Sequence, residues 1–349
     1  MTIADVAREA GVSRATVSRV LNGVPNVDAE TVASIRRTMD RMGYVRPAVR
    51  PGPKPRIHHP AQLRAGAIAL ITIGGSGDLF QEPTMSSVVE EIQAACRKRH
   101  LNLLLDQMTS PDQIPLCVQT RQVDGALLMV SGRPANMRAC IEKLAALIPS
   151  VHFFGPGHPV RGVDHVSVND VAVGALAYHS LQAAGCKSYA IVTVREEFLE
   201  ALLVRGRAFI DRAAMDHMPV QVFASPMAGV DPVGMWSSQP IKLGGVKDLS
   251  ALKLDGLPRP VGVFVTLETF LRPVHRELER HKLLSNGDAK IIVAGSTPYY
   301  IADLQPSPQR ISLDVPGIIG IAVDRLIHKA VQLPAGALTF LTSPRLLDQ

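Results

Sequence analysis

The chain has 349 residues, a formal net charge of +6, 46% hydrophobic residues and only 4% aromatic residues. This length is enough for two or three domains, and no run of about 18 uncharged apolar residues predicts a transmembrane helix. The first ten residues include Asp5, Arg8 and Glu9; because they lack the apolar core of a signal peptide, we expect a cytoplasmic protein. The four cysteines form no CxxC pair or Cys/His cluster, so we expect neither a metal site nor a cofactor.

The positive charge is concentrated at the N-terminus. Residues 1–56 contain ten Lys/Arg and five Asp/Glu, whereas the remainder of the chain is close to neutral. A small basic module attached to a large neutral one indicates a polyanionic partner for the small module.

Residues 2–44 predict three short helices. Residues of the N-capping type precede each stretch of apolar residues at helical spacing; they are Thr2, Ser13 and Asp28. Gly11 and Gly43 are expected to end the first and third helices. Two short helices joined by a tight glycine-containing turn form a helix-turn-helix.

Residues 46–56 have a different composition, with four prolines and four cations. Proline fixes φ and removes a backbone donor, so this segment predicts an extended linker rather than a helix.

From residue 65 onward, short aliphatic runs alternate with amphipathic segments. The runs expected as strands are 67–73, 101–106, 125–130, 151–154, 189–194, 261–265 and 291–294. The segments expected as helices include 86–99, 171–184, 202–215, 269–282 and 318–331. Apolar strands separated by helices are typical of parallel sheets buried on both faces.

The expected organisation therefore has three parts. Residues 1–45 form an all-α helix-turn-helix headpiece, and 46–64 form a basic, proline-rich linker. Residues 65–349 form an α/β domain with parallel sheets, which is too long for one compact sheet and is therefore expected to have two lobes.

The segment Thr2–Gly23, TIADVAREAGVSRATVSRVLNG, closely resembles the DNA-binding headpiece of the LacI/GalR family. The resemblance continues through the third predicted helix to Gly43-Tyr44. It implies that the second helix enters the major groove of operator DNA.

The likeness and the residue chemistry together give a set of candidate DNA contacts. Arg14 and Arg19 can each donate two hydrogen bonds to a guanine, and Ala15 can contact a thymine methyl group. The family resemblance implies that Arg14 and Ala15 vary with operator sequence and that Arg19 reads bases. Small polar residues suited to phosphate contacts complete the set: Thr2, Ser13, Thr16, Ser18 and Asn22.

The linker departs from the family pattern. The resemblance implies a short hinge helix with a leucine that inserts into the minor groove, but that position falls near Pro53 and no leucine is nearby. The segment Arg50–Arg56 instead resembles an AT-hook. Arg50, Lys54 and Arg56 could follow an A·T-rich minor groove in extended conformation, and the alternative is an ordinary basic tether.

The larger domain also resembles the family, whose core has the periplasmic-binding-protein fold. The segment 122–128, QVDGALL, matches a strand entry of the family, and 166–170, VSVND, matches Val-x-Val-Asp-Asn. Arg205 followed by Phe209 matches Arg-x-x-Gly-aromatic, with Ala208 in place of the glycine.

The resemblance implies an effector site between the two lobes. The expected effector contacts are Met85, Arg205 and Glu268. The chain departs from the family here, because 82–85 (EPTM) stands for Asn-Pro-Phe-Phe and Leu267-Glu268 stands for Asn-Asp. The alternative for Arg205 is a salt bridge within its own lobe.

These observations predict a homodimeric, sequence-specific DNA-binding regulator, a repressor controlled by a small molecule such as a sugar. The main rival is a ligand-independent dimeric DNA-binding protein whose core only dimerises. A periplasmic sugar-binding protein would share the core fold but not the headpiece. An enzyme is not expected, because no Walker A, HExxH, Gly-x-Ser-x-Gly or strand-following GxGxxG motif occurs.

Overall fold

The protein is described by a computed structural model that covers residues 2–21, 27–44, 63–74, 83–130, 134–155, 160–194, 200–225, 254–332 and 336–347. The chain divides into two compact units, Met1–Ile57 and His58–Gln349. Nearly all of the expected linker, 46–64, lies outside the described residues. Within them, no helix is long and apolar enough to cross a membrane.

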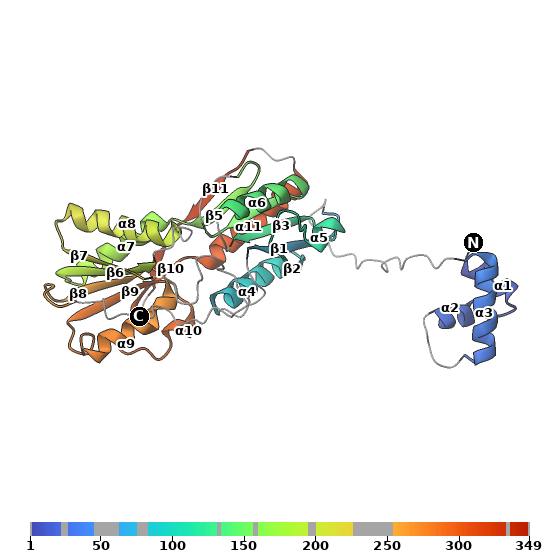
Figure 1. Ribbon diagram of the computed structural model, residues 1–349, viewed down its shortest axis with the longest axis horizontal. Helices are drawn as coiled ribbons and strands as arrows, with labels where there is room; N and C mark the ends of the chain where they lie inside the picture. The colour runs from blue at the N-terminus through green and yellow to red at the C-terminus, as the bar shows by residue number, and fades with distance from the viewer. Residues whose placement is uncertain are drawn as a thin grey trace. The chain divides into compact units, whose positions relative to one another are not determined.

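The first unit contains the three helices that the sequence predicts: α1 (Ile3–Glu9), α2 (Arg14–Leu21) and α3 (Ala29–Met42) (Figure 1). Thr2 and Asp5 form a reciprocal capping box at the start of α1. Asp28 caps α3 by accepting from the Thr31 amide, and Gly43 ends it in the left-handed conformation at φ 61°. Capping therefore fixes these helix boundaries, as the sequence indicated.

A small apolar core holds the three helices together. Val6 and Ala7 from α1, Val17 from α2, and Ile35 and Met39 from α3 are buried in one cluster. Because each helix contributes only one or two buried apolar side chains to this cluster, the opposite helix surfaces stay available for contacts outside the unit.

The second unit contains two six-stranded sheets. The first sheet defines lobe 1 and has the order β11-β5-β4-β3-β1-β2, with all neighbours parallel. Its strands are β1 (Ala67–Ile73), β2 (Asn102–Met108), β3 (Gly125–Val130), β4 (Ser150–Phe153), β5 (Asp164–Val168) and β11 (Thr339–Thr342).

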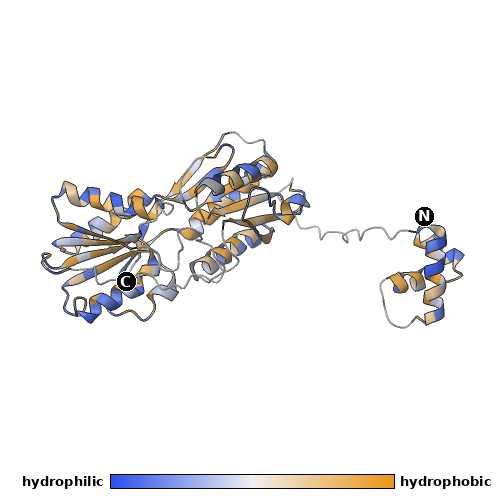
Figure 2. Cartoon of the chain, in the orientation of Figure 1, coloured by the Kyte–Doolittle hydropathy of each residue, from blue (hydrophilic) through white to orange (hydrophobic). Residues whose placement is uncertain are grey.

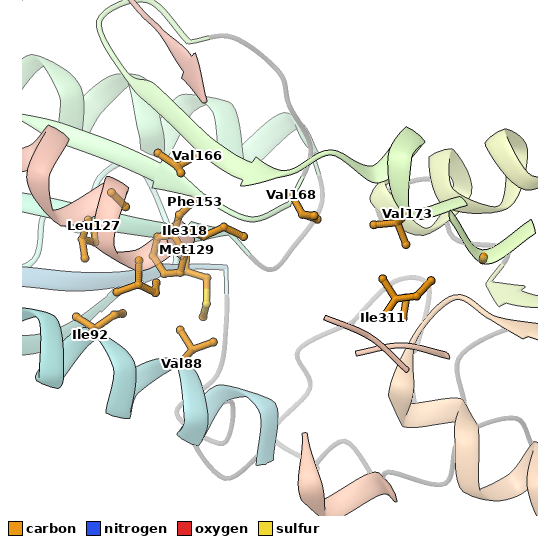
Figure 3. Packing of buried hydrophobic residues seen from close by; sticks show 14 of the residues in the cluster. Val88, Ile92, Leu127, Met129, Phe153, Val166, Val168, Val173, Ile311 and Ile318 are labelled. Carbon is orange, nitrogen blue, oxygen red and sulfur yellow. The ribbon is translucent and has the colours of Figure 1, made fainter. Parts of the chain in front are cut away.

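Helices cover both faces of the lobe 1 sheet: α4 (Pro83–Lys98), α5 (Leu116–Gln119), α6 (Pro134–Leu147) and α11 (Val315–Val331). Figure 3 shows Val88 and Ile92 of α4 facing Leu127, Phe153 and Ile318. The other face packs against α5 and α6. Every residue of β1 is buried for this reason, and the run at 67–73, apolar except for Thr72, reflects that two-sided burial.

The second sheet defines lobe 2 and has the order β12-β10-β9-β8-β6-β7. Its strands are β6 (Ser188–Val194), β7 (Val220–Ser225), β8 (Val261–Val265), β9 (Ala289–Ala294), β10 (Gln309–Ser312) and β12 (Arg345–Leu347). The last strand, β12, is antiparallel to β10, which departs from the all-parallel pattern expected. The remaining described pairs in this sheet are parallel.

The helices of lobe 2 are α7 (Asp170–Ala183), α8 (Glu200–Met215), a 3-10 turn η3 (Glu268–Phe270), α9 (Leu271–Arg280) and α10 (Pro298–Ile301). Their apolar sides pack against the sheet while polar residues lie outside (Figure 2). Chain order then shows three crossings between the lobes: after β5, after β10 and after β11. The observed fold is the predicted combination of a helical headpiece and a two-lobed, parallel-rich α/β domain.

Candidate nucleic-acid interface and effector site

The turn between α1 and α2 fixes the start of the candidate recognition helix. Gly11 adopts φ +64° in this turn, a conformation that favours glycine. The Thr16 amide donates to Ser13 Oγ over 3.1 Å, and the Ser13 and Thr16 hydroxyl oxygens lie 2.9 Å apart. Ser13 therefore caps α2, and its exposed hydroxyl lies at the amino end of the helix.

The exposed side of α2 carries the residues predicted to contact bases. Val17 is completely buried and anchors the helix to the headpiece core. Arg14, Ala15 and Arg19 are exposed, while Thr16 and Ser18 are half-buried. One face of the helix thus presents two guanidinium groups and a methyl group, the chemistry that major-groove recognition uses.

Thr2 also caps α1, in addition to its predicted phosphate contact. Its backbone N–H and its hydroxyl both donate to Asp5 Oδ2 over 2.9 Å. These bonds from Thr2 hold the pKa of Asp5 below its ordinary value. The exposed hydroxyl of Thr2 would have to share its bonding between the cap and a phosphate.

Four predicted DNA contacts lie outside the described residues. They are Asn22, Arg50, Lys54 and Arg56. Arg41 of α3, which was not predicted to contact DNA, bonds within the headpiece: its Nη2 donates to Glu9 Oε1 over 2.8 Å. That bond joins the end of α1 to α3.

In the core, Glu268 is 4% exposed at the carboxyl end of β8. Its Oε2 accepts from the Thr297 amide over 2.8 Å, and its Oε1 accepts from the Thr297 hydroxyl over 2.5 Å. The same Oε1 accepts from Thr84 Oγ1 of α4 over 3.0 Å. The carboxylate therefore bonds to both lobes.

Arg205 lies in the second turn of α8 and is 6% exposed. Its Nε donates to Asp170 Oδ1 over 2.7 Å, and its Nη1 donates to the Thr266 carbonyl over 3.0 Å. The salt bridge within lobe 2 that the sequence left open is therefore present. Burial raises the pKa of Asp170, and the charge of Arg205 opposes that rise.

The structure brings the three predicted effector residues to neighbouring elements. Arg205 bonds to Thr266, two residues before Glu268, so both charged groups are held at the end of β8. Met85 is half-buried beside Thr84 on α4 and packs against the main apolar cluster. The sequence analysis did not predict the partners Thr84, Thr266 and Thr297, because no motif near them in the sequence indicates these contacts.

A second buried polar pair was also missed. His152 of β4 and His165 of β5 are register partners whose ring centroids lie 5.0 Å apart. Burial, followed by the charge of His165, lowers the pKa of His152 to about 3. The Nε2 of His152 and both ring nitrogens of His165 are buried without a hydrogen-bond partner in the described structure.

Comparisons with known proteins agree with these features. The sequence pattern described as "Bacterial regulatory proteins, lacI family" matches residues 2–47. The chain is 32% identical over 190 residues to the HTH-type transcriptional regulator MalR of Streptomyces coelicolor. That match covers 52% of this chain and 51% of MalR, so it spans about half the length of that relative.

The headpiece is thus similar to the lacI family of bacterial regulatory proteins, and the chain is similar to the regulator MalR over about half of its length.

Two solved structures of transcription regulators have the same fold over nearly their whole length. A transcriptional regulator CelR–cellobiose complex superimposes with a TM-score of 0.61 at 18% identity, covering 100% of this chain and 98% of that chain. A lac repressor dimer bound to operator and the anti-inducer ONPF superimposes with a TM-score of 0.62 at 16% identity, with the same coverage. The resemblance of the headpiece to the family and the fold class predicted from sequence are confirmed.

Proposed function

We propose that this protein is a sequence-specific DNA-binding transcription regulator of the LacI family that acts as a repressor and has no enzymatic activity. The observation that carries the proposal is the capped start of α2, where Arg14, Ala15 and Arg19 are exposed on a helix anchored by Val17. Such a helix presents its first turns to base edges. The relative MalR is named as a transcriptional regulator.

Selection of binding sites from random duplexes with the full chain tests this proposal. We expect enrichment of one sequence with two related half-sites, bound at least a thousandfold more tightly than random DNA. Affinity that depends on salt but not on sequence would contradict it, because phosphate contacts alone carry no sequence information.

The proposed domain division is a headpiece at 1–45, a linker at 46–64 and an effector and dimerisation domain at 65–349. We propose a homodimer because one headpiece buries too little surface for tight specific binding. Edge strand β2 supports this, since its leucines 103–105 are half-buried or exposed although they are apolar. Apolar side chains on an edge strand are typical of an interface core.

We propose a sugar or related polar metabolite as the effector, contacted by Met85, Arg205 and Glu268. The fold is that of the CelR–cellobiose complex, and a carboxylate and a guanidinium at one strand end suit hydroxyl-rich ligands. A thermal-shift screen against sugars, sugar acids and nucleosides tests the assignment. A ligand at 100 times its Kd should add about 2.7 kcal/mol of stability, and the gain should disappear in Glu268→Ala.

One observation favours the second candidate function, a ligand-independent dimer. Both charged groups of the candidate site already have protein partners, Asp170 for Arg205 and Thr297 for Glu268. If no compound in the screen shifts the unfolding temperature while operator binding is specific, the core acts without an effector.

A further inference from the structure

The two lobes are joined by a polar contact at the end of β8. Thr84, in the first turn of α4 in lobe 1, donates its hydroxyl to Glu268 Oε1 of lobe 2 over 3.0 Å. Glu268 is 4% exposed, whereas Thr84 is half-buried. A hydrogen bond to a buried carboxylate is stronger than one between neutral groups.

Groups of lobe 2 hold the Glu268 carboxylate in place. Both Thr297 groups, the amide and the hydroxyl, donate to it. Gly295 makes room for it, since a Cβ at that position would lie 2.3 Å from Glu268 Oε2 and the backbone there has φ +129°. The acceptor that Thr84 meets is therefore already oriented, which reduces the entropy lost when the lobes come together.

The surroundings of the Thr84–Glu268 hydrogen bond also favour closure of the two lobes. The amino end of the 16-residue helix α4 carries the partial positive charge of its unpaired amides, and Glu268 bonds to a residue of that first turn. Next to Thr84, Met85 packs against an apolar cluster whose members come from both lobes, including Val168 of lobe 1 and Val173 of lobe 2 (Figure 3).

We propose that the Thr84–Glu268 hydrogen bond is an intramolecular latch that holds the two lobes closed when no ligand is bound. Thr84 occupies the position on the carboxylate that the hydroxyl of a ligand would take. A hydroxyl-bearing ligand therefore has to replace the Thr84 hydroxyl as donor, and binding changes the lobe contact itself. The inference that the latch affects operator binding rests on the proposed function. The inference that the latch holds the lobes closed is independent of it.

The test measures the distance between the lobes in the full chain without ligand. Spin labels on Lys143→Cys in α6 and Arg212→Cys in α8 place one exposed label on each lobe. The four native cysteines are buried, so they should not react. Mixing with an excess of unlabelled chain removes signals between subunits.

Thr84→Val keeps the side-chain volume and removes the donor, and it should shift or broaden the distance distribution toward longer distances. Thr84→Ser restores the donor and should restore the parent distribution. Thr109→Val is the matched control, because it removes an exposed threonine hydroxyl that donates to Gln113 within lobe 1; it should leave the distribution unchanged. Circular dichroism melting confirms that each variant is folded.

A distribution for Thr84→Val that equals that of the parent would overturn the latch. An equal opening in Thr84→Val and Thr109→Val would also overturn it, since the lobe-crossing bond would then have no special role. Operator affinity is titrated in parallel, and we expect Thr84→Val to change it at least threefold. If Thr84→Val opens the lobes but leaves operator affinity unchanged, the latch is supported. That outcome counts against the proposed function's link between lobe closure and DNA binding.

Discussion

Arg205 and Asp170 form an ion pair inside lobe 2, with Arg205 Nε 2.7 Å from Asp170 Oδ1 and side chains that are only 7% and 14% exposed. The pair joins α8 to the first turn of α7. The two helices pack closely at this point, because a Cβ on Gly174 would lie 2.2 Å from the Arg205 carbonyl oxygen. Arg205 is thus part of the packing between α7 and α8, whatever else it binds.

The ion pair leads to a stability prediction. Arg205→Ala leaves the Asp170 carboxylate buried without its partner, and it should cost about 3–5 kcal/mol of unfolding free energy. The double variant Arg205→Ala/Asp170→Ala removes both charges and should recover part of that loss. Urea unfolding of the parent, the single variants Arg205→Ala and Asp170→Ala, and the double variant measures the coupling. Additive losses would show that the pair contributes only through separate contacts.

Base recognition by α2 gives a second prediction. Arg19→Ala removes an exposed guanidinium from the face that carries Arg14 and Ala15, and should weaken binding to a selected operator by about 1–3 kcal/mol. Arg36 is also exposed but lies on α3, so Arg36→Ala is the control and should bind nearly as the parent does. Fluorescence anisotropy titrations measure both. Equal losses would contradict the assignment of α2 as the reading helix.

The dimer prediction concerns the edge of the lobe 1 sheet. Leu105 is 48% exposed on β2, the strand at one edge. Leu105→Asp should weaken self-association at least tenfold, because burying a carboxylate in an apolar interface is costly. The control is Leu147→Asp at the end of α6, where the leucine is 54% exposed but lies on no edge strand. Sedimentation equilibrium at micromolar concentration measures both variants, and a monomeric parent chain would refute the prediction.

The buried histidine pair predicts acid sensitivity of the core. The folded chain keeps His152 neutral, with a pKa lowered to about 3. A histidine of the unfolded chain has a pKa of about 6.5. Between these values the unfolded state binds a proton that the folded state does not. Stability is therefore full above about pH 6.5 and falls as pH decreases, by at most about 1.4 kcal/mol per pH unit for this group.

Replacing the histidine tests that linkage. His152→Leu should have a flatter dependence of unfolding free energy on pH between 7 and 5 than the parent. His328→Gln, at an exposed position on α11, should keep the slope of the parent. Identical slopes for all three proteins would mean that other groups cause the acid sensitivity.

The basic linker, which lies outside the described residues, carries the last prediction. Arg50→Ala/Arg56→Ala should weaken operator binding and reduce the salt dependence by roughly two units of slope. It should also relax a preference for A·T pairs beside each half-site. If affinity falls equally on all sequences and selected operators show no A·T bias, the segment is an electrostatic tether. A DNA-induced helix across residues 47–56 in NMR spectra would exclude the extended arm.

The sequence alone determined the headpiece almost completely. Thr2, Ser13, Asp28 and Gly43 act on backbone groups within a few residues of themselves, so capping chemistry is visible in a short window. The resemblance to the family identified the domain, and apolar runs buried on two faces identified the α/β class.

Short elements of the core were not predicted. Strands β10, β11 and β12 have only three or four residues, too few to show a period. Each becomes a strand because it pairs with a distant segment: Thr339 of β11, for example, pairs with His165. Helix α6 was also missed.

Tertiary structure also decided the state of the candidate site. The sequence placed Arg205 and Glu268 at one site, but it did not show that Arg205 meets Asp170 or that Glu268 meets Thr84, 184 residues away. Such partners depend on how the strands order in a sheet and on how the chain crosses between lobes. Local propensity acts over a few residues, so it cannot specify which distant side chain neutralises or bonds a buried charge.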